Sequence, residues 1–170
     1  ITERLVGSEM CIRDRYVMID EIKNTVQGAV YRLPLKMESG TMRAAISPVD
    51  GQLYYSGLTG WQAGATQEGS IQRLRYTAEK GIYLTEAKAR KDRLQLTFTE
   101  RVKPGSIAKE SFTASAWNYQ WSKGYGSPQL KPSDPLTRGV DELSIDSIAL
   151  SDDGLTLTVG IPQLTPCHNL

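Results

Sequence analysis

The stretch ELSIDSIALSDDGLTLTVGIPQL, Glu142 to Leu164, decides the fold class of this 170-residue chain. The residues Ser151 to Gly154 (SDDG) separate two runs in which apolar and polar residues alternate. The apolar positions are Ile148 and Leu150 before these four residues, and Leu155, Leu157 and Val159 after them. Alternation with a period of two predicts half-buried strands, and a Gly-containing turn between two such runs predicts a β-hairpin.

The same alternation continues upstream of this hairpin. Leu94 to Thr99 (LQLTFT) places Leu94, Leu96 and Phe98 on one face of a strand, and Ile82 to Thr85 is predicted as the strand before it. The sets LTFTERVKPGSI and SDDGLTLTVGIPQLTP are similar to bacterial immunoglobulin-like domains. The expectation for residues 82–170 is therefore an Ig-like β-sandwich, truncated at its C-terminus.

The first half of the chain also consists of short β-rich runs with turns between them. Their ranges are Ala29–Leu33, Met42–Ile46, Gln52–Leu58 and Ser70–Thr77, and SPVDG at Ser47–Gly51 is predicted as a hairpin turn. The order over Gln27 to Thr77 resembles a blade of the six-bladed propellers in soluble sugar-dehydrogenase-like proteins. Residues 16–77 are accordingly expected to be the C-terminal part of a β-propeller, and the missing blades of the same protein are their expected partner.

The first fifteen residues have a different origin from the rest in our interpretation. Leu5 to Arg15, LVGSEMCIRDR, matches the translation of a common sequencing adapter. We expect residues 1–15 to be a non-native segment that packs against nothing, and native sequence to begin near Tyr16; the alternative is a short native helix. Two modules are expected to join near Ala78 to Gly81.

Composition excludes several classes of function. The net charge of +1 gives no field that would attract nucleic acid, and no run approaches the roughly 20 apolar residues of a membrane helix. His168 is the only histidine, and neither it nor the carboxylates fall in a metal-binding or catalytic motif. We predict no catalytic residue and no metal site. Arg73 and Arg75 are predicted on a solvated strand face, and Ala87 to Arg93 at an exposed strand edge or turn.

Aromatic residues are the remaining candidates for a functional surface. The segment Ala116 to Pro135, AWNYQWSKGYGSPQLKPSDP, is long for a hairpin loop, and we call it the aromatic loop. With the Trp-Gln pair of the first half, it supplies the candidate residues Trp61, Gln62, Trp117, Tyr119, Trp121 and Tyr125. Such side chains can stack on sugars or anchor a protein partner, but packing against the sandwich or the neighbouring blade is the favoured interpretation.

The aromatic loop and the propeller-like half together resemble the C-terminal region of large secreted bacterial proteins. These are similar to quinoprotein (PQQ-type) sugar or sorbosone dehydrogenases and are often joined to cytochrome c modules. The resemblance implies a periplasmic or secreted location, PQQ and haem c in the larger protein, and none in this fragment. It implies a non-catalytic fragment whose Ig-like domain gives structural support. The alternative is a carbohydrate- or protein-binding scaffold with no redox role, and whether the larger protein is an enzyme stays open.

Overall fold

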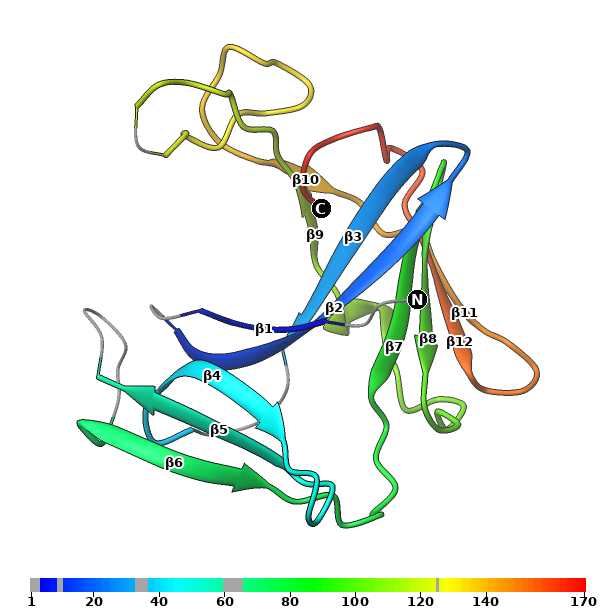
Figure 1. Cartoon of the computed structure of the whole chain (residues 1–170). Helices are drawn as coiled ribbons and strands as arrows, with labels where there is room; N and C mark the ends of the chain where they lie inside the picture. The colour runs from blue at the N-terminus through cyan, green and yellow to red at the C-terminus, as the bar shows by residue number, and fades with distance from the viewer. Residues whose placement is uncertain (1–3, 9–10, 33–36, 60–65, 125) are drawn as a thin grey trace. The chain divides into compact units, whose positions relative to one another are not determined.

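A computed structural model of the chain describes residues 4–8, 11–32, 37–59, 66–124 and 126–170, with side chains from residue 16 onward. The strands of this part of the chain pair antiparallel, which confirms the predicted all-β class. The chain divides into two compact units: unit 1, Ile1–Gly81, and unit 2, Ile82–Leu170. None of the sheets among the described residues combines strands of both units (Figure 1), so each unit is described by itself.

Unit 1 consists of two three-stranded sheets, each formed by strands consecutive in the chain. The first sheet contains β1 (Arg4–Ser8), β2 (Cys11–Ile22) and β3 (Thr25–Arg32). The second contains β4 (Gly40–Ile46), β5 (Leu53–Leu58) and β6 (Gly69–Leu74). Strand β4 lies next to β1 and β2. The described part of the predicted run Ala29–Leu33 therefore lies in the first sheet, whereas the other three runs form the second.

The residues 1–15 are described only in part. Their backbone includes β1 and the start of β2, and these strands pair with each other, with Val6 opposite Arg15. The described backbone of residues 1–15 takes part in a sheet, which differs from the expectation that this segment packs against nothing. The burial of Leu5, Val6 and Ile12, on which that prediction depends, lies outside the described side chains.

The turn at Ser47–Gly51 has the chemistry that its sequence predicts. Gly51 adopts φ +66°, a left-handed conformation that glycine reaches without steric cost. The Asp50 carboxylate accepts hydrogen bonds from the Gln52 amide at 3.1 Å and from the Tyr54 hydroxyl at 2.9 Å. Together with the Ser47 hydroxyl, these bonds lower the pKa of Asp50. The turn consequently fixes the register of β4 on β5, with Ile46 opposite Leu53.

One face of the β4–β5–β6 sheet carries a chain of polar side chains. The Tyr55 hydroxyl donates to Oε1 of Gln72 at 2.9 Å, and Nε2 of Gln72 donates to the Ser70 hydroxyl at 2.6 Å. The hydroxyls of Ser70 and Ser39 are bonded in turn, and Ser39 is fully buried. These hydrogen bonds are part-buried, and they offset the cost of removing the polar groups from water because each member has a partner.

The opposite face of the same sheet is exposed to solvent, as predicted for Arg73 and Arg75. Ile71 lies on the same side of β6 as Arg73, because the two residues are two positions apart in a strand, and it is 81% exposed. This solvated face is therefore partly apolar.

Unit 2 contains a four-stranded sheet in the order β11-β12-β8-β7 and a two-stranded ribbon, β10-β9. The sheet strands are β7 (Leu84–Arg90), β8 (Arg93–Phe98), β11 (Ser147–Leu150) and β12 (Thr156–Gly160). The ribbon strands are β9 (Ala114–Ala116) and β10 (Asp141–Leu143), and a short 3₁₀ helix, Lys109–Ser111, precedes β9.

The core of unit 2 forms on β12 and the residue that follows it. Leu157, Val159 and Ile161 are each at most 2% exposed. Alternate residues of the neighbouring strands pack against them, together with Ala114 and Leu143 of the ribbon. The packed sheet residues are Leu94, Leu96 and Phe98 of β8 and Ile148 and Leu150 of β11. The alternation predicted for these strands is confirmed, and the ribbon covers the apolar face that it creates.

The hairpin between β11 and β12 uses the predicted Ser151–Gly154 turn. Gly154 has φ +74°, and its amide donates to the Ser151 carbonyl at 2.8 Å. The Asp153 carboxylate accepts from the Ser151 hydroxyl at 2.6 Å and from the Leu155 amide at 2.9 Å. These hydrogen bonds lower the pKa of Asp153 because they stabilise its charged form.

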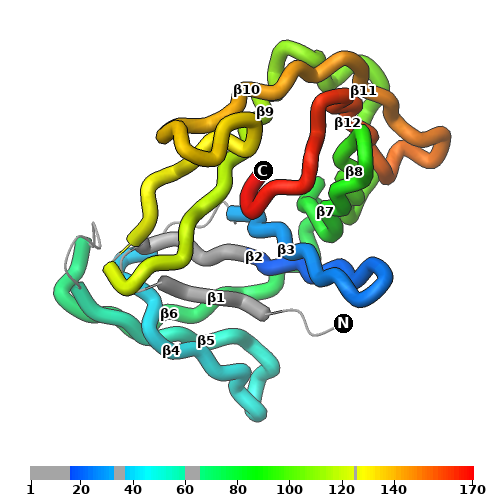
Figure 2. Tube along the Cα trace, turned by 90° about the horizontal axis from the view of Figure 1, so that it is seen from above, coloured from blue at the N-terminus to red at the C-terminus, as the bar shows by residue number. Residues whose placement is uncertain are grey.

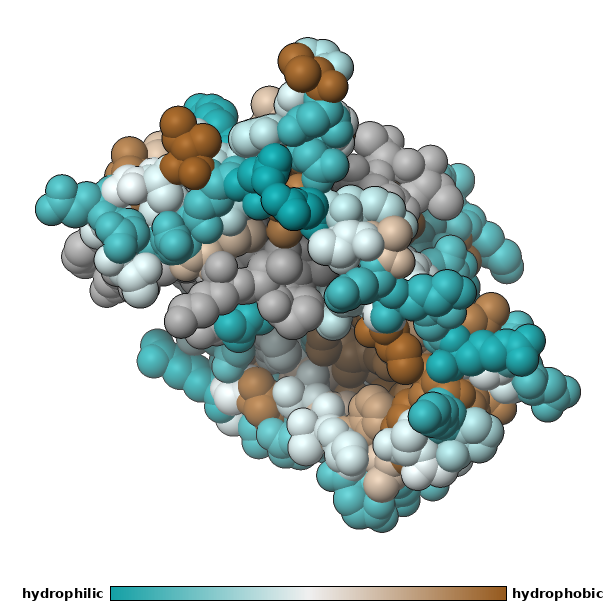
Figure 3. Space-filling model, turned by 90° about the horizontal axis from the view of Figure 1, so that it is seen from below, coloured by the Kyte–Doolittle hydropathy of each residue, from teal (hydrophilic) through white to brown (hydrophobic). Residues whose placement is uncertain are grey.

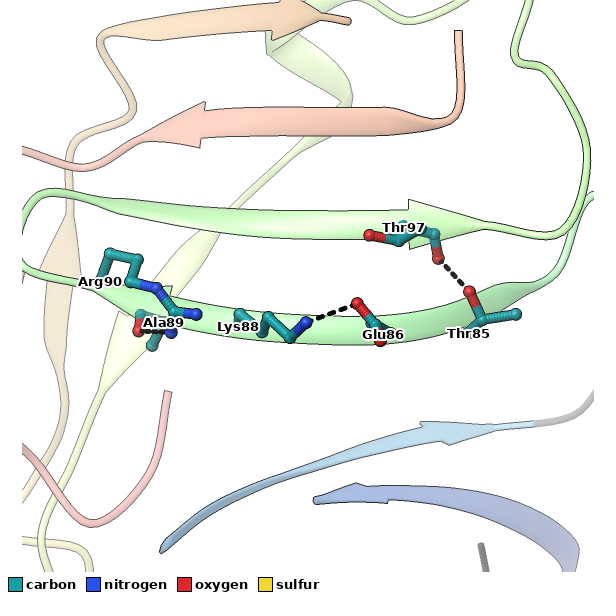
Figure 4. A network of polar contacts seen from close by, with 6 residues as sticks. All are labelled: Thr85, Glu86, Lys88, Ala89, Arg90 and Thr97. Atoms are coloured by element: carbon teal, nitrogen blue, oxygen red, sulfur yellow. Dashed lines mark hydrogen bonds and ion pairs between the residues drawn. The ribbon is translucent and has the colours of Figure 1, made fainter. Parts of the chain in front are cut away.

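Strand β7 is an edge strand of this sheet, as predicted for Ala87–Arg93, but it is half-buried as far as Arg90 and only residues 91–93 are exposed. Figure 4 shows polar side chains along it. Nζ of Lys88 lies 2.6 Å from Oε2 of Glu86, and the Thr85 hydroxyl donates to the Thr97 carbonyl at 3.0 Å. Charged side chains on an edge strand discourage pairing with other chains.

Large apolar side chains are also exposed singly on the surface. Val49 of unit 1 and Leu136 of unit 2 are each 94% exposed. On the face drawn in Figure 3, apolar side chains project at the rim among polar neighbours. Among the described residues there is no helix of the length and apolarity needed to cross a membrane.

Replacing Leu157 by alanine tests the core of unit 2. The variant Leu157→Ala is expected to lower the free energy of unfolding by about 2–5 kcal/mol, because it leaves a cavity at a position that is 1% exposed. The matched control Leu136→Ala removes the same atoms from an exposed position and should change it by about 0.5 kcal/mol or less. Urea unfolding followed by circular dichroism measures both. Equal effects of the two variants would contradict this description of the core.

Candidate functional site

The aromatic loop begins directly after β9 and is paired there with the C-terminal segment. Trp117 and Asn169 form an isolated antiparallel bridge with both hydrogen bonds present, Trp117 N–H to Asn169 O at 3.1 Å and the reverse at 3.0 Å. In Figure 2 the red C-terminal segment lies beside the segment that follows β9. Trp117, the first residue of the loop after β9, is thus held like a residue in a sheet.

The next two residues of the loop contact His168. The Tyr119 amide donates to Nδ1 of His168 at 3.1 Å, and the His168 amide donates to Oδ1 of Asn118 at 2.8 Å. The rings of Tyr119 and His168 are tilted by 43° with centroids 4.4 Å apart. We call these contacts the His168 clasp. Because Nδ1 accepts a hydrogen bond, the neutral imidazole carries its proton on Nε2.

The first part of the loop is also hydrogen-bonded to residues that follow later in the same loop. Asn118 and Leu130 exchange backbone hydrogen bonds of 2.8 and 2.9 Å, and Leu130 also forms a bridge with Arg138. The Gln120 amide donates to the Ser127 hydroxyl at 2.8 Å. Isolated backbone bridges and one side-chain hydrogen bond therefore join the described parts of the loop, although its length and its content of glycine and proline suggest an irregular connection.

Asp141 at the start of β10 holds the end of the loop. Its two carboxylate oxygens accept hydrogen bonds from the Ser133 hydroxyl and amide, each 2.7 Å long. These bonds lower the pKa of Asp141, since they favour the ionised form. The contribution of Asp141 to stability is accordingly present above the ordinary aspartate pKa and is lost as the pH falls through the lowered value.

Three of the candidate residues lie in the described part of the loop, and they differ in exposure. Trp117 is half-buried, Tyr119 is 51% exposed, and Trp121 is 91% exposed. Trp121 does not pack against the unit that carries it, so the predicted packing against the sandwich is wrong for this residue. Trp61, Gln62 and Tyr125, the other candidates, lie outside the described residues.

Further features of unit 2 are a half-buried cysteine and a hollow beside the ribbon. Among the described residues, no three histidine, cysteine or acidic side chains come close enough to hold a metal ion. Burial raises the pKa of the Cys167 thiol, which lowers its reactivity. A hollow of about 280 Å³ beside the ribbon is lined by Lys109, Glu110, Phe112, Thr113, Ala114, Glu142, Leu143 and Ile145. Its charged groups belong to exposed side chains, and it does not include the aromatic candidates.

The sequence did not indicate that His168 belongs to the candidate site. His168 lies 49 residues from its partner Tyr119 along the chain, and no motif links the two positions. Comparison with known proteins gives no match: no family model, no curated protein and no solved structure matches this chain. The site is therefore defined by its own geometry, which is an exposed indole on a loop that is braced on both sides.

Truncating the Trp121 side chain distinguishes an exposed position from one that is packed in the interior. The variant Trp121→Ala is expected to change the free energy of unfolding by about 0.5 kcal/mol or less, because the side chain is 91% exposed. If the side chain were buried, its truncation would instead lower the free energy of unfolding by about 3–5 kcal/mol. Urea unfolding followed by circular dichroism measures the difference, and a loss in the larger range would contradict the exposed position.

Proposed function

We propose that unit 2 is a non-catalytic binding module that presents the aromatic loop to a partner. The observation that carries this proposal is Trp121, a large aromatic side chain that is 91% exposed in its unit. Burial of an indole in a complex removes a large apolar area from water, and tryptophan is enriched among residues that dominate binding energy. An exposed tryptophan on a loop with ordered contacts therefore fits a recognition surface.

The bracing of the loop supports the same proposal. The bridges at Trp117 and Asn118 and the His168 clasp hold the backbone before Trp121 on two sides. A backbone ordered before binding loses less conformational entropy when a partner is bound. Tyr119, two residues before Trp121 in the chain, is half exposed beside His168, so the loop offers a second exposed aromatic ring.

The test is a comparison of binding by the whole chain and two variants. Immobilised protein is probed with soluble and insoluble polysaccharides and with purified secreted proteins, including c-type cytochromes. The wild-type chain is expected to bind at least one of them, and Trp121→Ala to bind it at least about tenfold more weakly. Leu136→Ala, which removes another exposed apolar side chain of unit 2, should bind as the wild type does. Equal binding by Trp121→Ala and wild type would refute the proposal.

A second proposal concerns the larger protein, and the turn at Ser47–Gly51 favours it. This turn connects β4 and β5 of a three-stranded antiparallel meander, in the order expected for part of a propeller blade. We propose that unit 1 is such a part, in a secreted or periplasmic dehydrogenase-like protein with PQQ and haem c, where unit 2, as an Ig-like sandwich, gives structural support. A cytochrome c domain is a partner under this proposal. The gene sequence upstream tests it: further blades and a CxxCH motif support it, and their absence opposes it.

A further inference from the structure

We propose that Trp121, Tyr119 and His168 form a subsite for a carbohydrate, in which a sugar ring stacks on Trp121 and a hydroxyl accepts a hydrogen bond from Nε2 of His168. The inference rests on the proposed binding function and names the ligand class of the same surface. Three observations carry it: the exposed indole of Trp121, the half-exposed ring of Tyr119, and the position of the proton on the His168 imidazole.

The aromatic rings supply the stacking surface. One face of a pyranose ring consists of C–H groups, which pack on the apolar face of an indole. Trp121 is 91% and Tyr119 is 51% exposed, so both rings are open to such contact. Residues two apart in an extended segment are separated by about 7 Å, a spacing that suits one ring or two adjoining rings of an oligosaccharide.

His168 supplies a directed hydrogen-bond donor at the same surface. Its Nδ1 accepts from the Tyr119 amide at 3.1 Å, which leaves the proton of the neutral ring on Nε2. The ring centroid lies 4.4 Å from that of Tyr119, and His168 is an exposed residue. The clasp thus orients an N–H donor beside the aromatic ring, where a hydroxyl group of a stacked sugar can accept it.

The surroundings of Trp121 favour a sugar over a protein as the occupant. The neighbouring residues Gln120, Ser122, Lys123 and Gly124 are all exposed, and none is apolar. A stable protein interface buries about 800 Å² on each partner and has an apolar centre. Two aromatic rings among polar side chains offer a smaller apolar area than such an interface needs. The polar side chains around them can form hydrogen bonds with the hydroxyl groups of a sugar.

The experiment measures binding of hexasaccharides to the whole chain by isothermal titration calorimetry. The probes are the β-1,4-linked hexasaccharides of glucose, xylose, mannose and N-acetylglucosamine. Wild type is expected to bind at least one of them, and Trp121→Ala to bind it at least tenfold more weakly. Leu136→Ala is the matched control and should leave the affinity unchanged.

Two replacements of His168 separate its donor from its clasp. His168→Asn places an acceptor close to the position of Nδ1 but has no group at Nε2, so it should keep the thermal unfolding midpoint and lose about tenfold in affinity. His168→Gln places an amide near the position of Nε2 and should keep more of the affinity than His168→Asn. The opposite order of the two variants, or wild-type affinity in His168→Asn, overturns the role of His168.

The binding results separate the carbohydrate subsite from the binding function on which it rests. If no hexasaccharide binds while Trp121→Ala loses a protein partner, the carbohydrate inference is overturned and the binding function stands. If neither hexasaccharides nor proteins bind to the wild-type chain, both are overturned.

Discussion

Burial of one face of β12 is the constraint on which the rest of unit 2 depends. Leu157, Val159 and Ile161 are almost fully buried, and β12 is hydrogen-bonded to β8 on one side and to β11 on the other. The ribbon covers this face through Ala114 and Leu143, and the aromatic loop makes up most of the connection between the two ribbon strands. The core therefore fixes both ends of the loop.

The same strand also leads the chain back to the loop. The Leu164 amide donates to the Ile161 carbonyl at 3.0 Å, and Leu164 packs against the core. The segment after it reaches Trp117 and supplies His168 and Asn169 as partners. The surface around Trp121 is thus a consequence of core packing, because the elements that order it are those that the core holds in place.

Local chemistry allowed much of the fold to be predicted from the sequence. Alternation identified the faces of β8, β11 and β12, and a Ser, an Asp and a Gly identified both hairpin turns, where Gly51 and Gly154 have positive φ. These features depend on residues close together in the chain. The candidate aromatic residues Trp117, Tyr119 and Trp121 were also identified, but their exposure was not. Exposure depends on which distant segments cover a side chain, and for that reason the expected packing of Trp121 against its own unit was wrong. Its packing against the other unit stays a prediction. The His168 clasp was missed because its partners are separated by about fifty residues.

Backbone bridges and the His168 clasp brace the aromatic loop, which presents an exposed tryptophan. Amide hydrogen exchange of the whole chain tests this bracing, because each bracing contact involves a particular N–H group. Slow exchange is predicted for the amides of Trp117, Asn118, Tyr119, Leu130 and Asn169, which donate hydrogen bonds of 2.8–3.1 Å. The amides of Ser122 and Lys123, beyond these contacts, should exchange fast. Exchange of all these amides at the rate of an unfolded chain, while those of β12 stay protected, would contradict the account.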